Sequence, residues 1–213
     1  MYYEKNPSTA HDIHELRVLL LDTPMTFQTD AGVFSKKMID YGSQVLLKSL
    51  HLEEGKSLLD VGCGYGTFLF SIAEIIDAKV IGVDIDEQMI STCRDKLKKH
   101  NTSNIEIING DVSTNITIKT LEKYKGEIDY VTLFNILHCE EPTKLLKNVY
   151  DLLNSSGRIG VIHWKYEKTP RGPSMDIRPT PEMIINWALN VGFTLKIQQE
   201  LKPYHYGLVF KKD

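Results

Sequence analysis

From residue 57 onward, short apolar runs alternate with longer amphipathic segments. A short apolar run predicts a buried strand, whereas apolar residues three and four apart predict a helix. Strands that alternate with helices are typical of a parallel sheet with helices on both of its faces. We expect strands at residues 57–61, 79–83, 104–108, 128–134 and 158–164, and helices at residues 67–76, 86–99, 116–124 and 142–154.

The C-terminal part departs from this alternation. Residues 166–180 are rich in proline, glycine and charged side chains, which predicts a loop. Thr180 and Pro181 then have the residue types that cap and begin a helix. The strand-like runs 193–200 and 204–210 follow with almost no chain between them, so they must pair antiparallel. The expected fold class is therefore α/β, with a mostly parallel sheet and an antiparallel C-terminal hairpin.

The N-terminal part is harder to interpret. Residues 1–33 show no sustained periodicity, and we expect them to be irregular. Residues 34–50 have apolar side chains at helical spacing, and Ser35 has the residue type of a helix cap. We interpret residues 1–50 as an extension that covers a ligand site on the domain formed by residues 51–213.

Charge and cysteine content narrow the choice of partners and location. The chain has 213 residues, a formal net charge of −3 and a pI of 6.2, so its composition does not favour nucleic-acid binding. Its cysteines form no Cys-x-x-Cys pair, which is typical of free thiols in a reducing compartment. No apolar run approaches the ~18 residues that span a bilayer, and the first residues lack the pattern of a secretory signal. The expected location is the cytoplasm, with no membrane partner.

The most informative motif is the glycine-rich run LLDVGCGYG at residues 58–66. An apolar strand leads into a loop with Gly62, Gly64 and Gly66 at alternate positions, and ligands of such sheets bind beyond the carboxyl ends of the strands. A threonine stands where the dinucleotide fingerprint has its last glycine, so the spacing does not favour a pyrophosphate. Asp60, just before the loop, suits a ligand with a cationic group.

Two further polar motifs follow the next strands. Asp84 ends the second strand, where an acidic side chain can accept hydrogen bonds from ribose hydroxyls. Ile85 would lie against an adenine face, and Asp86 is interpreted as the cap of the next helix. Asp111 follows the third strand, where a polar residue can receive an adenine amino group. The order of these motifs at successive strand ends indicates a ligand that contains a nucleoside.

With these motifs in place, residues 34–164 resemble the class I S-adenosylmethionine (SAM)-dependent methyltransferases. The resemblance implies a Rossmann-like sheet of seven strands with an antiparallel last strand, and SAM as the cofactor. It implies that the methionine end of SAM lies at the glycine loop and the transferable methyl near the end of the fourth strand. The cofactor-binding residues implied in this way are Asp60, Gly62, Cys63, Gly64, Gly66, Asp84, Ile85, Asp111, Val112 and Asn135.

A narrower resemblance concerns residues 29–42, which are similar to the approach segment of the ribosomal small-subunit guanine-N2 methyltransferases. Those enzymes carry an Asn-Pro-Pro motif after the fourth strand, which orients a planar amino group. Here residues 135–138 are Asn-Ile-Leu-His, which looks more like the small-molecule methyltransferases of the same superfamily. This departure falls on the catalytic element and argues against methylation of a nucleic-acid base.

Histidines are candidates for a general base, because methyl transfer can require removal of a proton from the acceptor. His138 follows the fourth strand and His163 ends the fifth, so both are expected at the catalytic edge of the sheet. His205 begins the last strand and is a candidate substrate ligand. The alternative is that each ring only makes a hydrogen bond within the fold. We expect no metal site, since no carboxylate or cysteine completes a ligand set with these distant histidines.

The loop at residues 169–179 has no generic role in the expected fold. Arg171 and Arg178 can each bind a carboxylate or phosphate through two parallel hydrogen bonds. We expect this loop, together with residues 1–50, to cover a small anionic or polar substrate. The alternative is a connecting loop whose arginines pair with nearby acidic side chains.

The leading hypothesis is SAM-dependent transfer of a methyl group to a small-molecule acceptor. An RNA methyltransferase is the alternative that the N-terminal resemblance favours and the acidic net charge opposes. A nicotinamide-dependent oxidoreductase is disfavoured by the glycine spacing and by the lack of a suitably placed Tyr-x-x-x-Lys pair. A non-catalytic SAM-binding module would share the binding residues of the enzyme.

Overall fold

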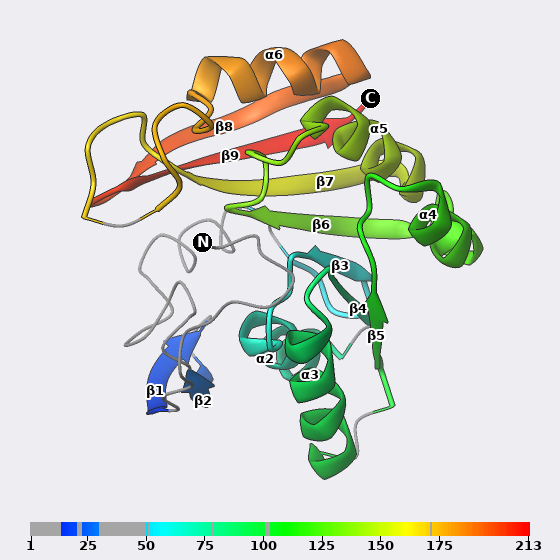
Figure 1. Ribbon diagram of the computed structural model, residues 1–213. Coiled ribbons are helices and arrows are strands. Elements are labelled where there is room, and N and C mark those ends of the chain that lie inside the picture. Colours follow the sequence, from blue (N-terminus) through cyan, green and yellow to red (C-terminus); the bar gives the residue numbers. More distant parts are fainter. Residues whose placement is uncertain are drawn as a thin grey trace.

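The computed structural model describes residues 14–20, 23–29, 50, 52–77, 79–100, 103–170 and 172–213 (Figure 1). Its main body contains a seven-stranded sheet with the strand order β5-β4-β3-β6-β7-β9-β8. The strands from β5 to β7 run parallel, whereas β9 pairs antiparallel with both β7 and β8. The expected mostly parallel sheet with an antiparallel C-terminal hairpin is therefore confirmed. The strands are β3 (Leu58–Val61), β4 (Val80–Asp84), β5 (Ile105–Asn109), β6 (Ile128–Phe134), β7 (Leu153–Trp164), β8 (Phe193–Leu201) and β9 (His205–Lys212).

Helices cover both faces of this sheet. Leu58 and Leu59 are both fully buried, but because neighbouring side chains of a strand point to opposite faces, they belong to different apolar clusters. The cluster of Leu58 includes side chains of α2, with Leu97 of α3 packed against it, whereas the cluster of Leu59 includes side chains of α4, α5 and α6. The helices are α2 (Thr67–Ile76), α3 (Glu87–His100), α4 (Asn115–Leu121), α5 (Pro142–Leu152) and α6 (Pro181–Val191), with a 3-10 turn η1 (Glu122–Tyr124).

The helix starts follow the capping residues in the sequence. Asp86 Oδ1 accepts hydrogen bonds from the backbone N–H groups of Gln88 and Met89 at the start of α3, as expected. Thr180 Oγ1 accepts from the N–H of Met183 in α6, which begins at a proline. These bonds satisfy backbone donors that have no partner inside the helix.

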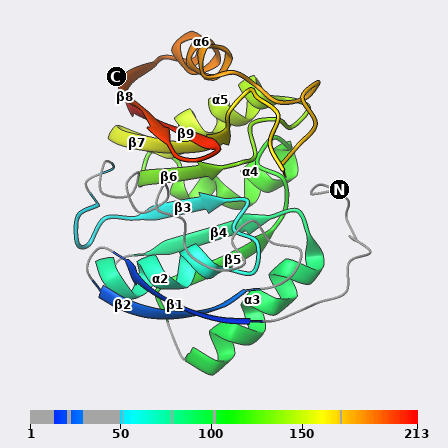
Figure 2. The same cartoon turned by 90° about the vertical axis from the view of Figure 1, so that its left-hand side faces the viewer.

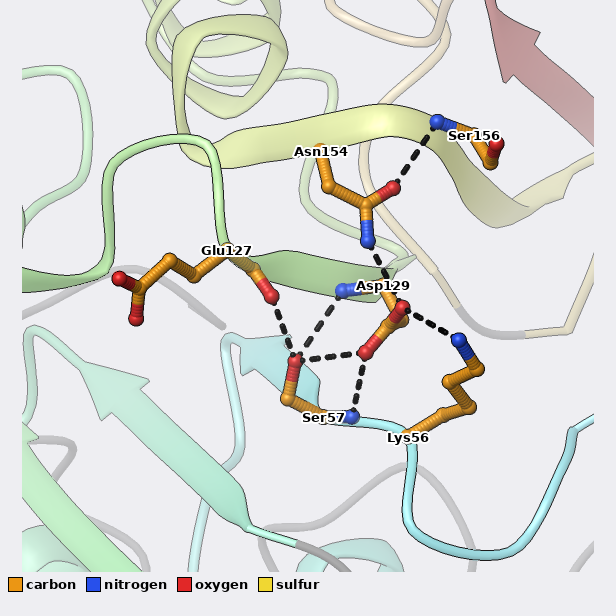
Figure 3. A network of polar contacts seen from close by, with 6 residues as sticks. All are labelled: Lys56, Ser57, Glu127, Asp129, Asn154 and Ser156. Carbon is orange, nitrogen blue, oxygen red and sulfur yellow. Dashed lines mark hydrogen bonds and ion pairs between the residues drawn. The ribbon is translucent and has the colours of Figure 1, made fainter.

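The amino ends of three neighbouring strands are joined by a polar network around Asp129 (Figure 3). Its Oδ2 accepts from the backbone N–H of Ser57 over 2.8 Å, and its Oδ1 accepts from Asn154 Nδ2 over 2.7 Å. Lys56 lies 3.5 Å from the same Oδ1. Asp129 stands at a register shift in β6, and its carboxylate ties the start of β3 to the start of β7. This network lies at the end of the sheet opposite to the glycine loop.

The structure corrects the interpretation of the N-terminal part. His14–Leu20 and Thr23–Thr29 form an antiparallel hairpin, β1–β2, instead of irregular chain. The expectation was wrong because the link between these strands contains no glycine or asparagine turn and because Pro24 weakens the strand pattern; a two-stranded hairpin consists of edge strands, which tolerate proline. β2 lies against α2 (Figure 2). The helix expected at residues 34–50 lies outside the described residues except for Leu50, which is helical and buried.

A smaller correction concerns the end of α5. The helix was expected to reach residue 154 and the next strand to begin at 158, but α5 ends at Leu152 and β7 begins at Leu153. The chain is already extended there because Leu153 pairs with Ile128 of β6. Among the described residues, no helix is long and apolar enough to cross a membrane.

Candidate active site

The loop between β3 and α2 turns sharply through glycines in left-handed conformations. Gly62 has a φ of 79°, and a Cβ at this position would lie 2.6 Å from Ile136 Cγ2. Gly64 has a φ of 56°, and a Cβ there would meet no atom within 4 Å. Gly62 is therefore required for close approach to the segment after β6, whereas Gly64 borders open space that a ligand can fill.

Asp84, at the end of β4, holds this loop in place. The backbone N–H of Gly62 donates to Val83 O, and the N–H of Gly64 donates to Asp84 Oδ2, each over 2.8 Å. Asp84 Oδ1 accepts from the N–H of Asp86 over 2.9 Å. Burial raises the pKa of Asp84, and the hydrogen bonds from Asp86 and Gly64 oppose this rise. Because each carboxylate oxygen can accept more than one hydrogen bond, Asp84 can hold the loop and still accept from ribose hydroxyls.

Asp60 lies beneath the loop, inside the sheet. It is 3% exposed, and its Oδ1 accepts a hydrogen bond from Thr132 Oγ1 over 2.7 Å. Burial raises the pKa of Asp60 to about 7, the bond from Thr132 opposes the rise, and the charge of Asp84 adds to it. A cation bound at the loop would stabilise the ionised form of this carboxyl group. Thr132 was not identified from the sequence. The available signal was that it is a polar residue within the apolar strand β6.

The thiol of Cys63 faces the protein interior. Cys63 Sγ lies 3.7 Å and Cys93 Sγ 3.2 Å from the carbonyl oxygen of Gly64, and both cysteines are buried. Burial and the contact with Cys93 raise the pKa of Cys63 well above its ordinary value, with the bond to Cys93 as the larger cause. The Cys63 thiol is therefore part of the packing beneath the glycine loop.

The expected adenine side of the site is partly apolar and open. Ile85, just after β4, is 49% exposed. Asn109, the last residue of β5, donates from Nδ2 to the carbonyl oxygens of Asp84 and Ile85, over 3.0 and 3.2 Å. The sequence did not single out Asn109, and its position as a polar strand end was the available signal. Its bonds fix the backbone that carries both expected cofactor residues.

Asp111 and Val112 follow β5 on the same edge. Asp111 Oδ1 accepts from the N–H of Ser113 over 2.8 Å, and its side chain is half-buried. Val112 is buried, and its carbonyl oxygen accepts from Asn148 Nδ2 of α5 over 2.7 Å. The turn is thereby fixed to α5, with the carboxylate of Asp111 at its start.

Asn135 follows β6 in a left-handed conformation, with a φ of 57°, which asparagine tolerates better than most residues. Its backbone N–H donates to Ile162 O of β7 over 2.8 Å. This bond ties the ends of two neighbouring strands together and redirects the chain towards Ile136 and His138.

His138 and His163, which the sequence placed on the same edge, lie against each other. His138 Nδ1 and His163 Nε2 are 3.0 Å apart, and the rings meet at 77°. His138 is 9% exposed and His163 is fully buried. Burial lowers the pKa of His138 to about 4 and that of His163 to about 3. Both rings are therefore neutral at physiological pH, and a neutral ring can accept a proton.

His205 belongs to an aromatic group on the opposite face of the sheet, because it pairs with Trp164, whereas His163 pairs with Tyr206. Trp164 and His205 face each other across the β7–β9 ladder, with ring centroids 4.2 Å apart, and Tyr204 stacks on Trp164 at 6.5 Å. Tyr206 lies on the other side, 6.1 Å from the ring of His163. His205 is 7% exposed and therefore lies in packed surroundings.

Arg178, one of the two expected substrate anchors, is buried within its own loop. It is 5% exposed, and its Nη1 donates to the carbonyl oxygens of Lys165 and Glu167 and to Thr169 Oγ1. Its Nη2 donates to the carbonyl oxygen of Pro173. The Nη groups of the guanidinium thus bind acceptors of the same loop. Arg171, the other expected anchor, lies outside the described residues.

Together these residues form one row along the carboxyl edge of the sheet. Groups suited to a nucleoside stand at β4 and β5, a carboxyl group suited to a cation stands at β3, and a neutral histidine pair stands at β6 and β7. The part of the chain that the structure describes contains no cluster of histidine, cysteine and carboxylate groups that could hold a metal ion.

Comparisons with known proteins point in the same direction. Residues 52–202 match the family model described as a methyltransferase domain. The chain is 28% identical over 142 residues to a demethylmenaquinone methyltransferase of Lactococcus lactis, covering 65% of this chain and 54% of the relative. It is 32% identical over 117 residues to the uncharacterized protein YbxB of Bacillus subtilis, covering 54% of this chain and 58% of the relative. The chain thus matches little more than half the length of either relative.

The fold also matches a solved structure. A SAM-dependent methyltransferase from Aquifex aeolicus superposes with a TM-score of 0.72 over 82% of this chain and 91% of its own, at 21% identity. At this identity, the likeness concerns the fold.

Proposed function

This chain belongs to the methyltransferase-domain family, within the class I SAM-dependent methyltransferase superfamily, and on that basis we propose that it transfers the methyl group of SAM to a small-molecule acceptor. One observation carries this proposal. The strands β4, β3 and β6 are neighbours in the sheet, and their carboxyl ends carry Asp84, Asp60 and His138 in this order. The row combines ligands for a nucleoside and for a cation with a neutral base at the reacting end.

The residues fit SAM in three respects. The space beside Gly64 is open, so the loop can receive the methionine end of the cofactor. Asp84 keeps acceptor capacity for the ribose, and the exposed face of Ile85 can lie against the adenine. We propose that residues 51–213 are the cofactor-binding domain and that the loop at 165–181 covers the site; of the cover proposed for residues 1–50, only residues 14–20, 23–29 and 50 are described. When bound, SAM supplies a methyl group that its sulfonium already activates.

His138 receives the proton in this mechanism. The glycine loop and Asp84 would hold the SAM that supplies the methyl group, and the proton that the acceptor loses would pass to the His138 ring. Burial keeps this ring neutral at physiological pH, with a pKa of about 4. Such a weak base matches an acceptor whose own proton is acidic, because general-base catalysis depends on the pKa values of both partners.

The acceptor that fits best is a small aromatic compound with an acidic hydroxyl group. Tyr204, which is 36% exposed, stacks on Trp164 at the end of β7, and an exposed aromatic ring favours planar ligands. Methylation of a hydroxyl, or of a ring carbon activated by loss of the hydroxyl proton, both fit this site. The Lactococcus lactis relative, a demethylmenaquinone methyltransferase, suggests an acceptor of this class.

Two alternatives remain to be separated by experiment. The resemblance of residues 29–42 to guanine-N2 methyltransferases favours an RNA acceptor, and apart from Thr29 that segment lies outside the described residues. A non-catalytic SAM-binding module would bind the cofactor and transfer nothing. For the compartment we infer the reducing cytoplasm, since the cysteines of the described residues are all free thiols.

The proposal is tested in two steps. Calorimetric titration with S-adenosylhomocysteine, with NADH as the control, examines the cofactor, and we expect binding of the former alone. Transfer of labelled methyl from SAM is then measured on hydroquinones and catechols, on small amines and on ribosomal RNA. Transfer to the aromatic hydroxyl compounds, lost in His138→Ala, supports the proposal. A preference for NADH would contradict the assignment of SAM as the methyl donor. Transfer to RNA alone would contradict the assignment of a small-molecule acceptor. Binding of S-adenosylhomocysteine without any methyl transfer would indicate the non-catalytic module.

A further inference from the structure

The contacts of His163 determine where the proton of its ring lies. Its Nδ1 is 3.4 Å from the carbonyl oxygen of Trp164, and its Nε2 is 3.0 Å from His138 Nδ1. A carbonyl oxygen can only accept a hydrogen bond, so Nδ1 of His163 must be the donor. A neutral imidazole carries one N–H group, and burial keeps this ring neutral. His163 Nε2 therefore has a lone pair and faces His138 as an acceptor.

The position of the hydrogen on the His138 ring follows from that on His163. Because His163 Nε2 accepts, His138 Nδ1 must carry the hydrogen of the bond between the two rings. His138 is neutral as well, so its Nε2 has the lone pair. We propose that His163 is a positioning residue: through its bond to the Trp164 carbonyl it fixes His138 in the tautomer whose Nε2 accepts the proton of the methyl acceptor. This inference rests on the proposed function of His138 as a base.

The surroundings favour this fixed arrangement. His163 is fully buried and lies between His138 and Tyr206, whose ring centroid is 6.1 Å away. Tyr206 is itself held by a hydrogen bond from its hydroxyl to the carbonyl oxygen of Pro179 over 3.1 Å. The positive charge of Arg178 lowers the pKa of both histidines in addition to burial, which opposes a charged pair before the reaction. After the reaction, His138 Nδ1 would donate more strongly to His163 Nε2, which stabilises the new positive charge.

The direct test reads the tautomers without turnover. Protein labelled with ¹⁵N-histidine and loaded with S-adenosylhomocysteine is examined near neutral pH by long-range ¹H–¹⁵N correlation, which separates protonated from unprotonated ring nitrogens. We expect both rings to carry the hydrogen on Nδ1. A hydrogen on His138 Nε2 or on His163 Nε2 in the wild-type protein overturns the proposal, whether or not methyl transfer has been observed.

Two variants of His163 separate the effect of its hydrogen-bond acceptor from the effect of its side-chain volume. His163→Phe keeps an aromatic ring but removes the acceptor, and we expect a mixture of His138 tautomers and a loss of about 10²-fold in kcat, the lower end of general-base contributions. His163→Gln keeps an acceptor oxygen within reach and should restore the single tautomer and much of kcat. Tyr206→Phe is the matched control, because it alters the packing beside His163 and should leave the tautomers unchanged.

The outcomes distinguish this inference from the proposed function. A single Nδ1–H tautomer of His138 in His163→Phe, or an equal loss of kcat in the phenylalanine and glutamine variants, would assign His163 a packing role only. S-adenosylhomocysteine should bind all of these variants equally, because neither histidine holds the glycine loop. If wild-type protein shows the expected tautomers but transfers no methyl group to any acceptor, the proposed function fails while the arrangement of the pair stands. Should His163→Phe not fold, the wild-type spectrum alone decides.

Discussion

Asp84 accepts a hydrogen bond from the backbone N–H of Gly64, 20 residues earlier in the chain, over 2.8 Å. The residue expected to bind the ribose therefore also holds the loop expected to bind the methionine end. Both halves of the proposed cofactor site depend on one carboxylate, so a change at Asp84 should affect more than a single ligand contact.

Asp84→Ala should abolish measurable binding of S-adenosylhomocysteine, because hydrogen bonds to a charged group contribute about 1.5–3 kcal/mol each and the loop loses its anchor as well. Titration calorimetry measures this loss. Asp86→Ala is the matched control: it removes the cap of α3, should cost about 1 kcal/mol of stability and should leave cofactor affinity almost unchanged. Equal affinity of the Asp84 variant and wild type would contradict the assignment of the site.

The affinity for SAM should rise with pH around neutrality because of Asp60. Burial raises the pKa of Asp60 to about 7, so the carboxyl group is protonated below this pH. A cation that binds beside the protonated group must first cause it to lose its proton, which weakens binding. Above pH 7 the group is already ionised and the affinity levels off. Calorimetry in buffers of different ionisation enthalpy should detect proton release near pH 6.5, absent in Asp60→Asn. A flat wild-type profile would show that the cofactor's charge does not reach Asp60.

Acid should destabilise the fold through the histidine pair. Burial lowers both pKa values from 6.5 to about 4 and about 3, so the contribution of each ring is present above pH 6.5 and is lost as the pH falls towards those values. The slope approaches about 1.4 kcal/mol per pH unit for each histidine. Urea unfolding at a series of pH values measures this slope, and the double variant His138→Gln with His163→Gln should reduce it. If the slope of the unfolding free energy against pH is unchanged in the double variant, groups other than these two histidines take up the protons.

Arg178→Ala should loosen the loop after β7 without reaching the cofactor. The variant leaves the carbonyl oxygens of Lys165, Glu167 and Pro173 without their buried donor, at a cost of about 3 kcal/mol in unfolding free energy. Urea unfolding and limited proteolysis of the loop measure the effect. Lys168→Ala, which removes an exposed positive charge from the same loop, should change stability by less than about 0.5 kcal/mol. A stable Arg178 variant with weaker acceptor binding would restore the original interpretation of Arg178 as a substrate ligand.

Asp129→Ala should destabilise the end of the sheet opposite to the active site. The carboxylate joins Ser57 and Asn154, and its loss leaves partly buried donors unsatisfied, at about 2 kcal/mol (Figure 3). Asp151→Ala is the control, since it breaks only an exposed ion pair with Lys147, which is worth about 0.3–0.5 kcal/mol. Chemical denaturation should separate the two variants, and SAM affinity should be the same in both.

The sheet could be predicted from the sequence because its periodicity is local. Each strand from β3 to β6 is a short apolar run, and the close spacing of β8 and β9 allows only antiparallel pairing. The hairpin β1–β2 could not be predicted in the same way, since its strands carry mixed side chains and a proline. Its pairing is visible only in three dimensions.

The candidate site was predictable by position but not by contact. The sequence placed His138 and His163 at one edge of the sheet, yet it could not show that two rings 25 residues apart share a hydrogen bond. Arg178 illustrates the opposite case. The charge of Arg178 suggested an anionic ligand, but carbonyl oxygens of its own loop accept its hydrogen bonds. Every residue has a backbone carbonyl group, so the sequence does not show which of them bind Arg178.

The bonds of Arg178 also have an evolutionary consequence. Within the described part of the chain, every hydrogen bond that its Nη atoms make ends at residues 165–173, and the strands with the proposed cofactor residues contribute none of them. The loop is therefore organised around one arginine at the end of β7. If this loop covers the substrate, as proposed, its replacement in a lineage or by engineering should change the choice of acceptor and leave the proposed cofactor residues in place.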